Sequence, residues 1–248
     1  MTDFSYQLYS SRNYPLSDTL KMLSGLGYTQ VEGFGGIFAE ADIAELKAEL
    51  DGNGLTMPTG HFSLEMVRDQ PGRVLEIATV LGMKGLFVPA VGPEDRVKDA
   101  AGWAELGRVL AEVGKPVQDA GLTFGWHNHA FEFAEIDSAE KPLDLILQGG
   151  PLALEFDVAW AVVGGQDPLA WIETYGDRLF AAHVKDIAPE GECADEDGWA
   201  DVGHGTMDWP AIMAALRKTP CQYFVMEHDN PNDHERFARR SLETAKTL

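Results

Sequence analysis

The segment Gly85-Leu86-Phe87-Val88-Pro89-Ala90 is a short apolar run that follows a helical pattern closed by Gly82. Parallel strands that are covered by helices on both faces are apolar throughout, whereas half-exposed strands alternate between apolar and polar residues. A glycine just after the last helical residue is a common helix end before such a strand. This stretch therefore predicts a buried parallel strand that comes after a helix.

The same unit, a short β-like run followed by a helical run, recurs along the whole chain of 248 residues. Strands are expected over residues 4–9, 29–34, 55–61, 85–91, 122–127, 152–157, 179–185 and 222–227, and helices over 16–26, 40–50, 71–81, 100–120, 142–147, 168–175, from 208 onwards and from about 232 to the end. Eight such units without a linker predict an α/β fold, a (β/α)8 TIM barrel that forms a single domain over residues 1–248. A doubly wound open sheet is the alternative.

One long stretch, from Pro189 to Gly205, is rich in acidic residues and glycine and shows no regular pattern. Long loops in compact domains are often functional, so we expect a lid over the site here. The helix that comes next begins with Asp208 as its N-cap and Pro210 in its first turn, which are favoured positions for both residues.

The composition excludes several classes of partner. The chain has 19 Lys and Arg against 40 Asp and Glu, a formal net charge of −21, so we expect no nucleic acid and no membrane surface as partner. No apolar run is long enough for a spanning helix. Cys193 and Cys221 have no zinc-type spacing, and the N-terminus lacks a signal-peptide pattern, which together favour the cytoplasm. A homo-oligomer is compatible with the sequence.

Ionisable side chains, most of them of metal-ligand type, gather at the ends of the predicted strands, which is where the active site of such a barrel lies. These are His61, His127, His129, Glu155, Asp157, His183, Lys185, Glu227 and His228. Imidazole and carboxylate groups together suit a divalent cation. Side chains of His127, Asp157, His183 and Glu227, taken from neighbouring strands, would converge above the barrel axis, so we expect them to form a metal centre.

Each of these residues also has a structural interpretation. A single strand-end histidine can be a buried hydrogen-bonding group, and Glu155 can serve only to balance Lys185 or His127. The segment Gly203-His204-Gly205 can be a turn. His234 is expected on a helix surface. The functional interpretation is favoured because five separate strands end in ligand-type side chains.

The motifs at these positions resemble the xylose-isomerase-like barrel superfamily, in its sugar phosphate isomerase/epimerase branch. In chain order they are Gln7-Leu8-Tyr9-Ser10-Ser11-Arg12, Gly27-Tyr28, Val31-Glu32, Trp126-His127-Asn128-His129-Ala130-Phe131-Glu132-Phe133, Leu154-Glu155-Phe156-Asp157-Val158-Ala159-Trp160, His183-Val184-Lys185-Asp186, Val202-Gly203-His204-Gly205, Asp208-Trp209 and Glu227-His228-Asp229-Asn230. They cover nearly the whole chain. They are specific for the fold and for metal dependence, and much less so for the substrate.

The resemblance implies a divalent metal held by one residue from each of the last four strands, here Asp157, His183, Glu227 and, on the fifth strand, His127. Epimerases of this type carry Glu at the fifth-strand position, so Glu155 is a candidate for the missing carboxylate. Inosose dehydratases and enzymes that act on 3-keto-glycosides look similar around a fifth-strand His. The expected metal is Mn²⁺, with Co²⁺, Mg²⁺, Fe²⁺ and Zn²⁺ as alternatives.

The expected reaction is proton abstraction next to a carbonyl, through an enediolate, by an isomerase or epimerase of a free sugar or keto-sugar. A lyase or dehydratase of a keto-sugar, 3-keto-glycoside or keto-inositol is the alternative. Candidate catalytic residues are Glu155, Glu227, His127, His129 and Lys185, and candidate substrate-binding residues are Arg12, His61, Trp160 and Glu132. A DNA-repair endonuclease is disfavoured by the acidity, and a non-catalytic subunit would show no turnover.

Overall fold

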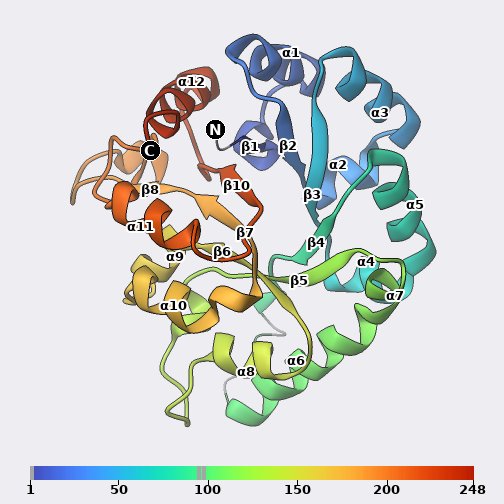
Figure 1. The fold of residues 1–248 in the computed structure, drawn as a ribbon, viewed down its shortest axis with the longest axis vertical. Helices are drawn as coiled ribbons and strands as arrows, with labels where there is room; N and C mark the ends of the chain where they lie inside the picture. Colours follow the sequence, from blue (N-terminus) through green and yellow to red (C-terminus); the bar gives the residue numbers. More distant parts are fainter. Residues whose placement is uncertain (1–2, 94–95, 97–98) are drawn as a thin grey trace.

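A computed structural model describes residues 3–93, 96 and 99–248, so the first two residues of the predicted domain lie outside the described part. Eight parallel strands close into a barrel in the order β1-β10-β7-β6-β5-β4-β3-β2, and the major helices surround it (Figure 1). The predicted (β/α)8 barrel is confirmed, and the open sheet is excluded. No helix in the described part of the chain is long and apolar enough to cross a membrane.

The barrel strands lie close to their predicted ranges. They are β1 (Phe4–Gln7), β2 (Gln30–Gly33), β3 (Thr56–His61), β4 (Gly85–Val88), β5 (Thr123–His127), β6 (Ala153–Asp157), β7 (Leu179–Val184) and β10 (Tyr223–Met226). Two further short strands form an antiparallel pair: β8 (Asp186–Ile187) lies just before the long predicted loop, and β9 (Trp199–Ala200) lies inside it.

The helices are α1 (Leu16–Leu26), α2 (Gly35–Glu40), α3 (Ile43–Gly52), α4 (Leu64–Asp69), α5 (Pro71–Leu81), α6 (Ala100–Val113), α7 (Lys115–Asp119), α8 (Pro142–Gln148), α9 (Val158–Val163), α10 (Pro168–Tyr175), α11 (Trp209–Leu216) and α12 (His234–Ala245). Short 3-10 turns lie at η1 (Leu8–Ser11), η3 (Phe131–Phe133), η4 (Gly176–Arg178) and η5 (Ala194–Glu196). The short helices α2, α4 and α9, which follow strand ends, were not predicted. Asp208 caps α11 as expected, because its side chain accepts from Ala211 N.

The predicted helix over 100–120 is wrong in one respect, because it is two helices. Pro116 has no N–H to continue the helical hydrogen bonds, so α6 gives way to α7 at Gly114. A Cβ at Gly114 would lie 2.0 Å from the Phe124 ring, so glycine at this position lets the chain pack closely on β5. The last helix begins at His234 rather than near 232, with the side chain of Asp233 accepting from Arg236 N.

Alternation along the strands separates the core from the site, because successive side chains of a strand point to opposite faces. Trp126 and Phe156 belong to the apolar core between the strands and the helices. Their chain neighbours His127, Glu155 and Asp157 are buried on the other face, inside the barrel. The barrel interior near the strand ends is therefore polar, while the layer outside it is apolar.

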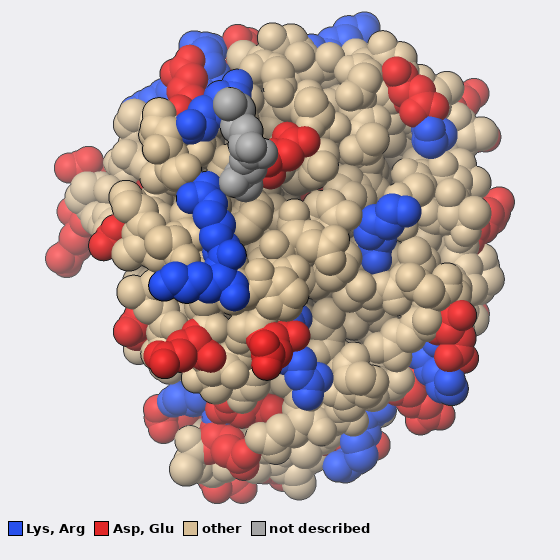
Figure 2. Space-filling model, in the orientation of Figure 1, with Lys and Arg blue, Asp and Glu red and all other residues tan. Residues whose placement is uncertain are grey.

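Charged side chains are dispersed on the face of the molecule drawn in Figure 2. There Lys and Arg occur in small groups interspersed with Asp and Glu, and most of the surface is uncharged. This view shows no broad basic surface of the kind that binds nucleic acid.

The close packing of β5 against β6 generates a stability prediction. A Cβ at Gly125 would lie 2.0 Å from the carbonyl oxygen of Ala153, so Gly125→Ala should destabilise the protein by roughly 1–3 kcal/mol through overpacking. Thermal unfolding should show a Tm lower by several degrees. Gly25→Ala is the matched control because nothing lies within 4 Å of its added Cβ inside α1, and its Tm should stay equal or rise. Equal Tm values for the two variants would contradict the prediction.

Candidate metal centre

The parallel register of the barrel brings the predicted ligands together at one end. His127 on β5 lies beside Glu155 on β6, and Asp157 on β6 lies beside His183 on β7. Glu227 follows the last residue of β10 directly. All five residues are at most 5% exposed.

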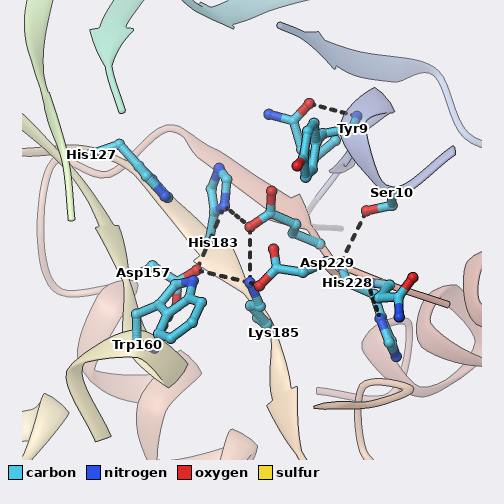
Figure 3. Close-up of polar contacts among 12 residues, drawn as sticks. Tyr9, Ser10, His127, Asp157, Trp160, His183, Lys185, His228 and Asp229 are labelled. Atoms are coloured by element: carbon cyan, nitrogen blue, oxygen red, sulfur yellow. Dashed lines mark hydrogen bonds and ion pairs between the residues drawn. The ribbon is translucent and has the colours of Figure 1, made fainter. Parts of the chain in front are cut away.

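His127, Asp157, His183 and Glu227, the four predicted ligands, converge. One donor atom from each can be chosen so that all lie within 4.8 Å of one another. His183 Nδ1 is 2.9 Å from Glu227 Oε2 and 3.8 Å from Asp157 Oδ2. Figure 3 shows His127, His183 and Asp157 turned toward the same region.

Unpartnered atoms at this point match a cation site. Asp157 Oδ2 and His127 Nδ1 are both buried without a hydrogen-bond partner. A buried carboxylate oxygen without a partner is costly, and a metal ion would satisfy Asp157 Oδ2, whereas His127 Nδ1 lies 3.3 Å from Glu155 Oε2. Two imidazoles and two carboxylates are donors that Zn²⁺ and Mn²⁺ accept. The residues present therefore fit a divalent cation.

Asp157 is held in place by the backbone of α9 and by Asn128. Its Oδ1 accepts from Trp160 N at 2.8 Å, which makes Asp157 the N-cap of α9 and leaves Oδ2 free. Asn128 donates to Asp157 O and accepts from Asp157 N, at 3.1 and 3.0 Å. Asn128 was quoted in the family motif but was not predicted as a site residue, although it fastens the end of β5 to the end of β6.

Lys185 lies beside the carboxylates of this cluster. Its Nζ is 2.6 Å from Asp229 Oδ2 and 3.4 Å from Glu227 Oε2, and it lies 4.9 and 4.2 Å from the ring centres of Trp160 and Trp199. Burial lowers the pKa of Lys185, but Glu227, Asp229 and Asp157 outweigh burial and raise it. Lys185 therefore stays charged, as one ammonium beside three carboxylates.

A second layer of polar groups lies deeper in the barrel. His61 Nε2 donates to Glu155 Oε2 at 2.5 Å, and His183 Nε2 donates to Glu32 Oε1 at 2.8 Å. Another candidate donor set, His61, His127, Glu155 and His183, overlaps the first. Glu32 was missed as a site residue. Its position inside an apolar strand, Val31-Glu32-Gly33, is the same signal that singled out Glu155.

The pKa directions follow from burial and pairing. Burial raises the pKa of Asp157 to about 7, and burial together with Glu155 raises that of Glu32 to about 7. Burial opposes ionisation of Glu227 as well, but Lys185 and His183 hold its pKa well below the usual range. Burial and Lys185 lower the pKa of His129 to about 3, so this imidazole is neutral.

A cleft of about 550 Å³ opens above the cluster. Of the predicted catalytic residues, His127, His129 and Glu227 line it, as do the predicted substrate-binding residues Arg12 and His61. Arg12 lies over the Tyr9 ring and donates to Tyr9 O and Asp229 O. The expected lid reaches the cleft through Asp197.

Other predicted residues lie behind the cleft lining. Glu155 and Lys185 are fully buried beneath it, and Trp160 packs against Lys185 and Trp199. Both oxygens of Glu132 are occupied by protein groups, Trp126 Nε1 at 2.8 Å and His129 N at 2.9 Å. Glu132 therefore supports the backbone of His129 from below.

Three histidines lie outside the cluster. His228 is turned away from it (Figure 3), and its ring packs against Phe237 of α12. His204 is exposed in a turn, as one interpretation expected. His234 was expected on a helix surface and is instead partly covered, since its ring stacks on Tyr14 at 3.6 Å and its Nδ1 bonds to Ser11.

The comparison with protein families can now be set beside this geometry. Residues 20–248 match the family described as xylose isomerase-like TIM barrel. The chain belongs to this family. The family pattern covers β2 through α12 and so includes every residue of the candidate metal centre.

Curated relatives matched by sequence are named inosose dehydratase. That of Bacillus thuringiensis is 30% identical over 88 residues, 36% of this chain and 30% of the relative. That of Lacticaseibacillus casei is 23% identical over 167 residues, 59% of this chain and 55% of the relative. The matches thus span about a third to a half of the length of these relatives.

Solved structures share the whole fold at low identity. A sugar phosphate isomerase/epimerase from Parabacteroides distasonis has a TM-score of 0.83 and 20% identity, with 100% of this chain and 94% of that chain covered. The 3-keto-D-glucoside 4-epimerase from E. coli has a TM-score of 0.74 and 17% identity, with complete coverage of both chains. The IolI protein, solved with a zinc atom, has a TM-score of 0.76 and 16% identity over 99% and 97% of the two chains.

The metal centre generates a prediction in which binding and stability change in opposite directions. Asp157→Asn should abolish the increase in Tm that Mn²⁺ or Zn²⁺ gives to the wild type, because it removes a charged ligand. It should also raise the Tm of the metal-free protein at pH 8 by roughly a few degrees, because a buried carboxylate with a raised pKa costs stability once it ionises. Asn can still cap α9.

The sign of this effect is fixed by the pKa of Asp157. A folded-state pKa near 7 against 3.8 means that the folded protein binds more protons between these values, so Asp157 lowers stability as pH rises through this window. The gain in Tm from Asp157→Asn should therefore vanish near pH 4. Scanning calorimetry with and without chelator measures both effects, and a metal-dependent increase in Tm that survives in the variant would contradict the assignment.

Proposed function

We propose that the protein is a divalent-metal-dependent isomerase or epimerase of a free sugar or keto-sugar, which moves a proton next to a carbonyl group. The observation that carries the proposal is that a carboxylate of the candidate metal centre, Glu227, and a neutral imidazole outside it, His129, line the same cleft. Glu227 can remove a carbon-bound proton and return it to the neighbouring carbon or to the other face, which gives isomerisation or epimerisation, while the imidazole moves a proton between substrate oxygens.

The residues have distinct roles in this proposal. Glu227 is ionised and is the base that takes the proton, and Lys185 and His183 hold its carboxylate in position. His129, whose neutral imidazole lines the cleft, accepts the proton of a substrate hydroxyl and gives it back to the carbonyl oxygen. Arg12 and His61 are placed at the cleft to hold substrate oxygens.

His127, Asp157, His183 and Glu227 are the proposed metal ligands. When bound, a divalent ion supplies Lewis acidity toward a carbonyl oxygen. The zinc atom in the IolI structure supports metal binding at this fold, and Mn²⁺ is the proposed ion, with Co²⁺, Mg²⁺, Fe²⁺ and Zn²⁺ as alternatives. Location in the cytoplasm stays a prediction.

Elimination is the second candidate function, and His61 favours it. Burial lowers the pKa of His61, but Glu155 and Glu32 outweigh burial and raise it, so this cleft residue is the one best able to protonate a departing hydroxyl. The inosose dehydratases among the relatives also support a dehydratase that acts on a keto-inositol or keto-sugar.

Solvent exchange distinguishes the two candidates. Metal-loaded protein should be incubated in D₂O with a panel of keto-sugars, keto-glycosides and keto-inositols. Deuterium uptake into substrate or epimer without elimination is expected for the first candidate, and a dehydrated product for the second. Absence of both from the whole panel would contradict the proposed chemistry.

Substitution of His129 tests the proposed acid–base pair. His129→Gln should lower kcat by roughly 100-fold or more, because a positioned acid–base group contributes about that much. Metal content should stay at the wild-type level, since His129 is in neither donor set. His204→Gln, in an exposed turn, is the control and should retain full activity. Equal kcat values for wild type and His129→Gln would remove His129 from the mechanism.

A further inference from the structure

Glu32 reaches across the barrel interior from β2. In the barrel order, β1 and β10 separate β2 from β7, yet Glu32 Oε1 lies 2.8 Å from His183 Nε2. The same oxygen accepts from Gln7 Nε2 at 2.7 Å and lies 3.3 Å from His61 Nε2. Glu32 itself is fully buried.

Gln7 fixes the orientation of this carboxylate. Its Oε1 accepts from Tyr9 N at 3.0 Å, so its amide nitrogen is the end that faces Glu32. A carboxylate oxygen anchored in this way presents an acceptor to His183 at a fixed place. Rotation of the His183 ring would break that hydrogen bond.

The two nitrogens of His183 therefore face different partners. Nε2 faces Glu32, whereas Nδ1 faces Glu227 and Asp157, the two carboxylates of the candidate metal centre. A metal-binding histidine commonly donates its second N–H to a carboxylate, which fixes the ring and makes the other nitrogen a better ligand.

We propose that Glu32 is a positioning residue of the metal centre, which holds the Nε2–H of His183 so that Nδ1 is presented to the ion. Through the same oxygen Glu32 also contacts His61, which in turn bonds to Glu155. One anchored carboxylate thus orients both layers of the cluster. This inference rests on the metal centre proposed above but not on the identity of the substrate.

Metal affinity tests the inference without any activity measurement. Glu32→Gln keeps the volume and an acceptor but loses the charge, and Glu32→Ala loses both. Titration of Zn²⁺ and Mn²⁺ against a fluorescent chelator should show Kd values weaker by roughly 10-fold for Gln and about 100-fold for Ala, the range known for such supporting partners. Glu196→Gln is the matched control, because Glu196 is a buried carboxylate that pairs with Arg236 and is in neither donor set. Its metal affinity should equal that of the wild type.

A spectroscopic measurement separates positioning from a general structural role. In zinc-loaded, ¹⁵N-labelled wild type, the Nε2–H proton of His183 should be slow to exchange because Glu32 accepts it. In Glu32→Ala the Nε2–H proton of His183 should exchange rapidly or its signal should be lost, while the backbone amide spectrum remains that of a folded protein. If Glu32→Ala does not fold, the isosteric Glu32→Gln carries the test through its metal affinity.

The outcomes are distinguishable from those of the proposed function. Wild-type metal affinity in Glu32→Gln together with an unchanged His183 signal would overturn the inference and leave the function intact. Weaker metal affinity in Glu32→Gln would support the inference. If the metal-loaded wild type at the same time shows no turnover on any keto-sugar, the proposed function is overturned and the inference is not. Failure of the wild type to bind a divalent ion would overturn both.

Discussion

Uncompensated negative charge inside the barrel is the constraint on which the rest of the structure depends. Five carboxylates, Glu32, Glu155, Asp157, Glu227 and Asp229, lie in one cluster with a single ammonium, Lys185. Removing each such ion from water costs several kcal/mol. The fold tolerates this cost because its stability comes from the apolar layer between strands and helices, so the polar interior is free to serve chemistry.

Different groups compensate the negative charge in the two layers of the cluster. In the deep layer, His61 and His183 pair with Glu155 and Glu32, so protons on imidazoles can compensate there. In the upper layer, Lys185 is already shared among its carboxylates, and Asp157 Oδ2 has no hydrogen-bond partner. The upper layer, which is also the layer next to the cleft, is therefore the place where the proposed cation would balance negative charge.

Much of this was predictable from local sequence, and the misses have physical causes. The barrel followed from apolar strands and glycine-ended helices, and convergence of His127, Asp157 and His183 followed from parallel strand ends. His228 follows Glu227 directly and so its side chain falls on the opposite face. Its position near a strand end does not by itself show on which face the side chain lies. Glu32 could not be assigned a role because its partner, His183, is 151 residues away in the chain and is reached only across the closed barrel.

Histidine at the fifth-strand position changes what the upper layer can accept. A carboxylate at residue 127 would add a third charged ligand, whereas neutral His127 leaves two, Asp157 and Glu227, to match a divalent ion. Lys185 then balances Asp229, so the upper layer would be neutral with the proposed divalent ion bound. Arg12 is the one Lys or Arg among the described residues that line the cleft, and two carbonyl oxygens already bind its guanidinium. For the proposed function, a single basic side chain at the cleft favours an uncharged keto-sugar over a phosphorylated one, because a phosphate would have only Arg12 to pair with.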